Sequence, residues 1–263
     1  MRRITMDDGV QLAVRETGNP NGPTVVCVHG FPDNSRLWDG VAERLASRFR
    51  VIVYDVRGAG QSDRPKETKA YLLERLAADL ATVIQEVSPK EDVHLLAHDW
   101  GSIQVWHALG RGQKAASFTS ISGPDLDRAG EWIRAQARRP RAWGRLAKQL
   151  ASSTYIVFFQ VPRAAELASR AGLISRMLRR PVDHDDFRHG LKLYRANMFR
   201  RLTRPRPAPV KVRTQILVPT RDRFVGAGIQ NAEGASIRSV DAGHWLPLSQ
   251  PLFVAECVEE FIV

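Results

Sequence analysis

One aspartate in an expected tight turn is the first residue of this chain that could do chemistry. Asp99 lies at the centre of Ala97-His98-Asp99-Trp100-Gly101, between an apolar run and a helix-like stretch. A small-x-nucleophile-x-Gly sequence between strand and helix is typical of a nucleophile elbow, where small flanking residues allow a sharp turn that exposes the central side chain. The alternative interpretation is that Asp99 only caps the N-terminus of the following helix.

Two later residues supply the acid and the histidine that such a nucleophile needs. Asp222 follows the apolar run 216–219, and His244 follows Gly243 in a loop. A single loop aspartate or histidine is usually a surface residue. Here the order is nucleophile, acid, histidine, as in enzymes built on this elbow, and each residue comes just after an expected strand. This pattern favours a catalytic set.

An aspartate nucleophile predicts a particular reaction. A carboxylate is already ionised near pH 7, so it attacks without a base and displaces a good leaving group from an sp³ carbon. The product is an alkyl ester of Asp99. We expect His244, oriented by Asp222, to activate the water that hydrolyses this ester, so that the net reaction adds water.

The sequence His29-Gly30-Phe31-Pro32 follows the first apolar run. The backbone N–H groups of Phe31 and Trp100 are candidate donors to the oxyanion that forms during ester hydrolysis. We interpret His29 as a structural hydrogen-bonding residue.

The elements that must position these residues alternate between strand and helix. Continuous apolar runs predict strands buried on both faces of a parallel sheet, at residues 24–28, 51–54, 93–97 and 214–218. Apolar residues at helical spacing predict helices at residues 38–49, 71–87 and 252–262. This alternation predicts an α/β fold with a mostly parallel, doubly wound sheet.

A helical insertion interrupts this alternation. Between the two halves of the sheet, helical patterns occur at residues 129–137, 142–161, 164–179 and 185–202, separated by prolines, and a Pro-rich linker at 204–209 leads back to the sheet. We expect a core domain of residues 1–124 and 206–263 and an inserted helical domain of residues 125–205.

The net charge of +11 over 263 residues lies in the insertion. Residues 125–205 contain 18 Lys and Arg against 7 Asp and Glu, whereas the rest of the chain contains 21 of each. No nucleic-acid recognition motif accompanies these charges, so we expect no nucleic-acid partner. A basic stretch with tryptophan, at residues 131–146, fits peripheral contact with an anionic membrane, and an arginine-rich solvated surface is the alternative.

The remaining features of the composition bear on the cellular compartment and on cofactors. No apolar stretch is long enough to span a bilayer, and no signal-peptide core follows the N-terminus. The two cysteines give neither a disulfide framework nor metal spacing, which fits a cytoplasmic protein. No zinc, dinucleotide or phosphate-loop motif occurs, so we expect no metal and no cofactor. The oligomeric state stays open.

Taken together, these motifs resemble α/β-hydrolase-fold enzymes of the epoxide hydrolase and haloalkane dehalogenase branch. The matching residues are His29-Gly30-Phe31-Pro32, Asp55-Val56-Arg57-Gly58-Ala59-Gly60-Gln61-Ser62, His98-Asp99-Trp100-Gly101, Asp222 and His244. The His-Asp-Trp-Gly sequence selects the aspartate-nucleophile branch over serine hydrolases. The resemblance implies an α/β-hydrolase fold in which the helical insertion is the family's cap.

The resemblance also implies which leaving group departs. Related epoxide hydrolases protonate the epoxide oxygen with two cap tyrosines, and this chain has matching sequences at Tyr155-Ile156-Val157-Phe158-Phe159-Gln160-Val161-Pro162 and Tyr194-Arg195-Ala196-Asn197-Met198. The expected reaction is the opening of a small hydrophobic epoxide to a vicinal diol by water. The alternative for either tyrosine is aromatic packing. Alternatives for the whole chain are a haloalkane dehalogenase, with Trp132 and Trp143 as cap tryptophans, and a non-catalytic ligand-binding protein.

Overall fold

The computed structural model describes all 263 residues and is built around one eight-stranded sheet. The strands are β1 (Arg2–Thr5), β2 (Gln11–Gly18), β3 (Thr24–Val28), β4 (Arg50–Tyr54), β5 (His94–His98), β6 (Ser117–Ile121), β7 (Thr214–Pro219) and β8 (Ser236–Val240). Their order across the sheet is β1-β2-β4-β3-β5-β6-β7-β8. Strand β2 pairs antiparallel with β1 and β4, and all other pairs are parallel. The predicted mostly parallel sheet is confirmed.

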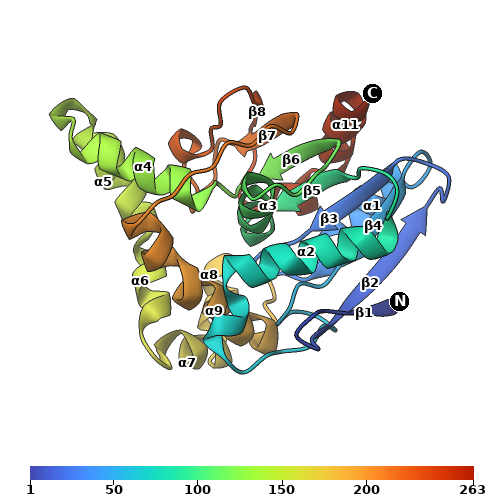
Figure 1. Cartoon of the computed structure of the whole chain (residues 1–263). Helices are drawn as coiled ribbons and strands as arrows, with labels where there is room; N and C mark the ends of the chain where they lie inside the picture. Colours follow the sequence, from blue (N-terminus) through green and yellow to red (C-terminus); the bar gives the residue numbers. More distant parts are fainter.

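Helices cover both faces of the sheet. They are α1 (Asp39–Leu45), α2 (Leu73–Val87), α3 (Trp100–Gly110), α10 (Leu246–Ser249) and α11 (Pro251–Ile262). Helices α2 and α3 pack on one face over a cluster that includes Leu80 and Val105. Helices α1 and α11 pack on the other face over a cluster that includes Val41 and Val254 (Figure 1). The sheet is therefore doubly wound, as predicted.

The continuous apolar runs predicted their strands accurately, whereas strands of mixed composition escaped prediction. Strand β3 is buried at all five residues, as its apolar sequence predicts. Strand β6, Ser-Phe-Thr-Ser-Ile, is equally buried although three of its five residues are polar, and its Thr119 hydroxyl accepts a hydrogen bond from the Gln215 side chain at 2.9 Å. Strands β1, β2 and β8 lie toward the sheet edges and are partly exposed. Each of these strands has at least half of its residues outside the core, which leaves too little apolar pattern to predict them from sequence.

Six helices lie between β6 and β7. They are α4 (Leu126–Ala137), α5 (Trp143–Ser152), α6 (Thr154–Gln160), α7 (Ala164–Arg170), α8 (Leu173–Leu178) and α9 (His184–Thr203). A third apolar cluster, which includes Phe31, Trp100 and Phe187, joins them to the loops at one end of the sheet. The buried Arg201 on α9 also pairs with Asp127 and Glu74. The exact domain boundaries stay a prediction.

Two expected cap helices are each broken in the structure. The pattern over 142–161 forms α5 and α6, because Ser153, with φ of −98° and ψ of 4°, leaves the helical conformation and is both the C-cap of α5 and the N-cap of α6. The pattern over 164–179 forms α7 and α8 because Gly172 adopts a left-handed conformation, with φ of 72°. Both predictions of one continuous helix were therefore wrong.

None of the helices combines the length and the apolar character needed to cross a membrane.

Candidate active site

Asp99 occupies a strained turn between β5 and α3. Its φ of 51° and ψ of −124° are unusual for a residue with a side chain, and its N–H donates to the Ile121 carbonyl at 2.9 Å. Any side chain at Gly101 would collide with the Val28 carbonyl. The small residue thus lets α3 approach β3 and holds Asp99 out of the sheet. Although Asp99 is at the N-cap position, its side chain makes no capping bond to α3.

The two carboxylate oxygens of Asp99 have different surroundings. Oδ1 accepts a hydrogen bond from the Phe31 N–H at 2.7 Å. The Trp100 N–H also hydrogen-bonds to this carboxylate and lowers its pKa. A Cβ atom at Gly30 would lie 2.5 Å from both Oδ1 and the Trp100 nitrogen, so only glycine fits there. Oδ2 is turned toward His244, whose Nε2 lies 3.6 Å away.

His244 is oriented by a buried carboxylate on its far side. Its Nδ1 lies 2.8 Å from Oδ2 of Asp222, whose other oxygen accepts from the N–H groups of Phe224 and Val225. Because Nδ1 donates to Asp222, Nε2 is left with a free lone pair on the Asp99 side. The buried His98 also bonds the His244 carbonyl through Nε2 at 2.9 Å, which fixes the loop.

Burial and charge set the protonation of this pair. Burial raises the pKa of Asp99 to about 6, although His244 and the two N–H donors act in the opposite direction. Burial alone would lower the pKa of His244, but the Asp222 and Asp99 carboxylates outweigh it and the pKa is raised. Burial also opposes ionisation of Asp222, yet His244 and the backbone donors leave the pKa of Asp222 lowered. Asp222 is therefore the fixed anion of the set.

These pKa directions predict a rate that rises with pH. In the expected reaction attack needs ionised Asp99, so kcat/KM should fall about tenfold per pH unit below about pH 6. Ester hydrolysis needs neutral His244, whose pKa is raised, so kcat should fall on the acid side as well. Burial, with the Asp99 charge, raises the pKa values of Tyr155 and Tyr194, so no alkaline decline is expected below about pH 10. Initial rates of product formation, corrected for the uncatalysed reaction, measure this. A constant rate down to about pH 4 would contradict the raised pKa of Asp99.

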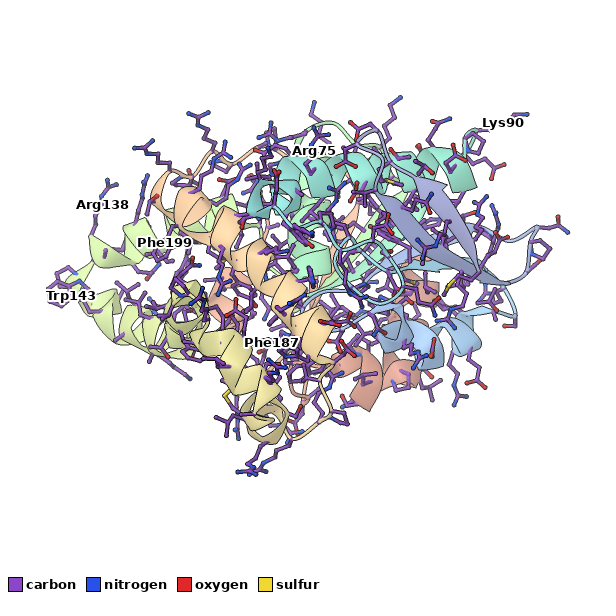
Figure 2. The ribbon with its side chains drawn as sticks, turned by 90° about the horizontal axis from the view of Figure 1, so that it is seen from below. Arg75, Lys90, Arg138, Trp143, Phe187 and Phe199 are labelled. Carbon is purple, nitrogen blue, oxygen red and sulfur yellow. The ribbon has the colours of Figure 1, made fainter.

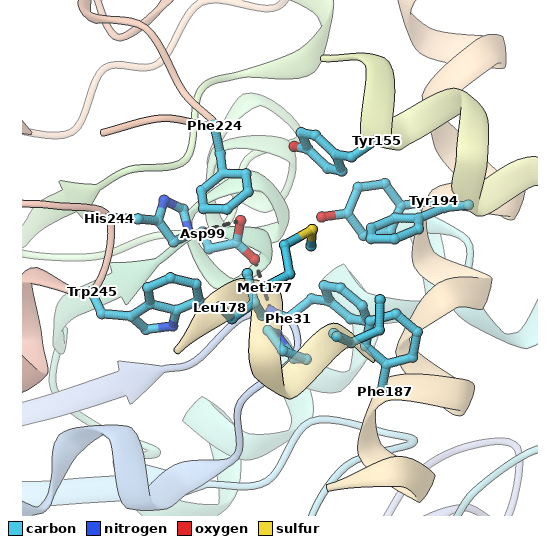
Figure 3. A pocket seen from close by; sticks show the side chains of 13 residues that line it. Phe31, Asp99, Tyr155, Met177, Leu178, Phe187, Tyr194, Phe224, His244 and Trp245 are labelled. Atoms are coloured by element: carbon cyan, nitrogen blue, oxygen red, sulfur yellow. Dashed lines mark hydrogen bonds and ion pairs between the residues drawn. The ribbon is translucent and has the colours of Figure 1, made fainter. Parts of the chain in front are cut away.

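Tyr155 on α6 and Tyr194 on α9 face Asp99 across the cavity. Both phenol oxygens point toward the aspartate (Figure 3). The two rings meet edge to face with centroids 6.0 Å apart, and Tyr194 also packs against Trp100 and Phe31. Helix α6 begins at Thr154, just after the break at Ser153 and one residue before Tyr155. The break that the sequence did not predict therefore starts the helix that carries this phenol.

Two apolar cavities meet at these residues. One has a volume of about 410 Å³ and is lined by Phe187, Met177 and Trp245 among others. The second has a volume of about 670 Å³ and is lined by Ile133, Leu150 and Met198 among others. Both are lined by Asp99, Tyr155, Tyr194 and Phe224. A ligand with its reactive carbon at Asp99 therefore has apolar space on two sides.

The other residues of the predicted motifs have supporting positions. His29 is buried, with Nε2 accepting from the Val56 N–H at 3.0 Å and Nδ1 facing the Gly30 carbonyl at 2.9 Å. Pro32 lines the smaller cavity. The predicted catalytic and oxyanion residues are all brought together around one carboxylate.

Two further residues at the site were not predicted. Phe224 packs against His244 with ring centroids 5.1 Å apart and lines both cavities. Asp33 is buried and accepts from Trp245 Nε1 at 2.8 Å and from the Arg180 guanidinium, which ties the cap to the loop that carries His244. Asp33 directly follows the His-Gly-Phe-Pro sequence, so its position was a usable signal. For Phe224 the only signal in the sequence was its position two residues after Asp222.

A sequence model described as the alpha/beta hydrolase fold matches residues 23–205 of this chain. The chain belongs to the α/β-hydrolase fold family. The predicted fold class is thereby confirmed, because the match includes the elbow and the sheet order and doubly wound layers agree with it.

Curated relatives of this α/β-hydrolase chain include mycobacterial proteins. It is 40% identical over 289 residues to a Mycobacterium tuberculosis protein named "Probable oxidoreductase EphD", a match that covers 99% of this chain and 49% of that protein. It is 35% identical over 182 residues to "Epoxide hydrolase A" of the same organism, covering 68% of this chain and 53% of that protein. The chain therefore spans about half the length of these relatives.

Solved structures share the fold at low identity. An epoxide hydrolase from metagenomes of hot environments superposes with a TM-score of 0.81 at 22% identity, covering 100% of this chain and 98% of that one. A point mutant of a Bacillus megaterium epoxide hydrolase, in complex with its diol product, gives a TM-score of 0.81 at 20% identity, covering 99% of each chain. At these identities the likeness concerns the α/β-hydrolase fold alone.

Proposed function

We propose that this chain is an epoxide hydrolase that opens a hydrophobic epoxide to a vicinal diol. The observation that carries the proposal is the position of Asp99, held by the Phe31 N–H at one oxygen and faced by His244 and two phenols from the other sides. The names of a 35% identical relative and of the structural neighbours agree with this activity.

In the first step Oδ2 of Asp99 attacks an epoxide carbon and the carbon–oxygen bond of the ring breaks. The departing oxygen is an alkoxide unless it takes a proton, and Tyr155 and Tyr194 supply it. Because burial raises the pKa of both phenols, they remain protonated and available as acids at neutral pH. The result is a hydroxyalkyl ester on Asp99.

In the second step water attacks the carbonyl carbon of this ester. His244 Nε2 takes a proton from the water, and Asp222 stabilises the imidazolium through Nδ1. The oxygen that becomes negative is Oδ1, which already lies on the Phe31 N–H. Collapse of the oxyanion expels the diol oxygen, which takes the proton from the His244 imidazolium. The carboxylic acid left on Asp99 then gives its proton back to the phenolate, so Asp99, His244 and the tyrosines all return to their starting states.

The cap tryptophans do not favour the haloalkane dehalogenase alternative. Trp143 is 58% exposed and Trp132 packs near Gly228, so neither lines a cavity at the nucleophile. The Trp245 N–H, which does lie at the site, is already bonded to Asp33.

A substrate panel tests the proposal directly. We expect the purified chain to form diols from aryl, terminal aliphatic or fatty-acid epoxides and to release no halide from haloalkanes. Wild-type protein that is inert on all epoxides but releases halide would establish the dehalogenase alternative. Protein that binds epoxides without any turnover would instead be a ligand-binding member of the fold.

Removing both phenols should selectively block ring opening. The Tyr155→Phe, Tyr194→Phe double variant should lose at least about 10³-fold in kcat/KM for diol formation, since proton donation to the leaving oxygen is worth about 10² to 10⁴. Tyr54→Phe is a matched control, because Tyr54 is a buried tyrosine outside the cavities whose hydroxyl has no partner. If the double variant turned over epoxide as fast as Tyr54→Phe, the two phenols would have no role as acids in the mechanism.

A further inference from the structure

One surface feature is not explained by the proposed function: the tip of the hairpin formed by α4 and α5, which comprises residues 138–145. From residue 132 to residue 165 the chain contains seven basic residues and no acidic one. Four of these, Arg138, Arg139, Arg141 and Arg145, lie within eight residues at the turn. All four are exposed, and none forms an ion pair. This segment carries uncompensated charge, unlike the arginines of α9 that pair with Asp127, Glu74 and Glu166.

The same tip exposes apolar side chains. Trp143, the first residue of α5, is 58% exposed, and Leu150, two turns later on that helix, is 50% exposed. Large exposed apolar side chains beside unpaired charge are typical of an interaction surface.

The hairpin projects from the body of the molecule. Helices α4 and α5 extend beyond the sheet and the other cap helices (Figure 1). In the view of Figure 2, Trp143 and Arg138 lie at one end of the molecule, and Lys90 of the sheet domain lies at the other. A projecting tip can reach a flat surface before the rest of the protein touches it.

We propose that the α4–α5 hairpin tip docks on an anionic lipid bilayer. Trp143 enters the headgroup region, where the amphipathic indole ring is stabilised, and the four arginines bind lipid phosphates. Each basic residue close to such a surface strengthens partitioning about fivefold, so the tip alone supplies a large part of the affinity. The exposed Leu150 side chain on the same helix matches acyl chains and has no counterpart on a nucleic-acid phosphate backbone.

A consequence for substrate entry rests on the proposed epoxide hydrolase function. Leu150 is half exposed and also lines the larger cavity, so that cavity reaches the surface on α5, the helix that follows the tip. The smaller cavity reaches the surface at Met177, on α8, which is 59% exposed. A lipophilic substrate dissolved in the bilayer therefore meets the larger cavity first.

Vesicle sedimentation tests the docking without using enzyme activity. We expect wild-type protein to sediment at low salt with phosphatidylcholine vesicles that contain about one third phosphatidylglycerol, and not with phosphatidylcholine alone. About 1 M salt, where the screening length is about 3 Å, should release most of it. The triple variant Arg138→Glu, Arg139→Glu, Arg141→Glu should lose at least about a hundredfold in partitioning.

A matched variant separates the tip from net charge. Lys90→Glu, Lys114→Glu, Lys211→Glu makes the identical charge change at exposed lysines outside the cap, and it should sediment within about threefold of wild type. Trp143→Ser should lose about tenfold, with its salt dependence retained. Circular dichroism confirms that all variants are folded.

Three results would overturn the proposal. One is wild-type protein that does not sediment with anionic vesicles at low salt. Another is equal loss of binding in the lysine variant and the arginine variant, which would make the effect one of net charge. The third is binding to a random oligonucleotide, abolished by the arginine variant, with no binding to vesicles. None of these depends on diol formation, so a failure here leaves the catalytic proposal separately testable.

Discussion

Replacing Asp99 with alanine should reduce kcat for diol formation by at least about 10⁴-fold, the range seen when a covalent nucleophile is removed. The reason is specific to an aspartate nucleophile: the carboxylate forms the bond to the substrate carbon, and nothing else in the cavities can replace it. His244 and the phenols would remain in place around an empty position. The measurement is diol formation under saturating epoxide, with thermal unfolding as the check on the fold.

The control for this variant is another aspartate at the start of a helix. Asp183 caps α9 through bonds from the N–H groups of Asp185 and Asp186, and Asp183→Ala should cost about 1 kcal/mol of stability without a large effect on kcat. If Asp99 served only the N-terminus of α3, the two variants would behave alike. Equal activity of the Asp99→Ala protein and wild type would exclude the nucleophile role.

Replacing His244 with glutamine should stop the reaction halfway. Ring opening needs only Asp99 and the two phenols, whereas hydrolysis of the ester needs the base. We therefore expect one equivalent of hydroxyalkyl ester to accumulate, followed by a steady-state rate at least about 10³-fold below wild type. Intact-protein mass spectrometry should show the mass of one epoxide added, and peptide mapping should place it on Asp99.

The double variant Asp99→Ala, His244→Gln provides the control, since it should carry no adduct. Single-turnover hydrolysis in heavy-oxygen water gives an independent readout with the wild-type protein. The first diol should contain the light oxygen that came from Asp99, and the heavy oxygen should appear in the carboxylate. Heavy oxygen in the first diol would mean that Asp99 acts as a base toward water and forms no ester.

The sequence placed the elements buried on both faces most accurately. Strands β3, β4, β5 and β7 were all predicted to within about two residues, because a strand covered on both sides must be apolar throughout. Strand β6 was not predicted because several of its buried side chains are polar. Their hydroxyl groups form hydrogen bonds inside the protein, such as the one between Thr119 and Gln215. No local pattern distinguishes such a strand from a loop.

The types and order of the site residues could also be predicted from the sequence, for a related reason. The elbow needs a small residue two positions after Asp99, and the structure shows why at Gly101, where any side chain would collide with the Val28 carbonyl. Such steric requirements act over a few residues and therefore leave a local signature. Tyr155 and Tyr194 had no such requirement and were found through family resemblance alone.

What the sequence by itself determined was the alternation of buried strands and helices, the types and order of the reactive residues, and the confinement of positive charge to residues 125–205. Only the tertiary structure decided how the cap meets the core. It fixed the separate surroundings of the two Asp99 oxygens, the breaks at Ser153 and Gly172, the two cavities that share Phe224, and the projection of the α4–α5 hairpin. These features arise from contacts between segments far apart in the chain, and such contacts depend on side-chain packing that no local pattern encodes.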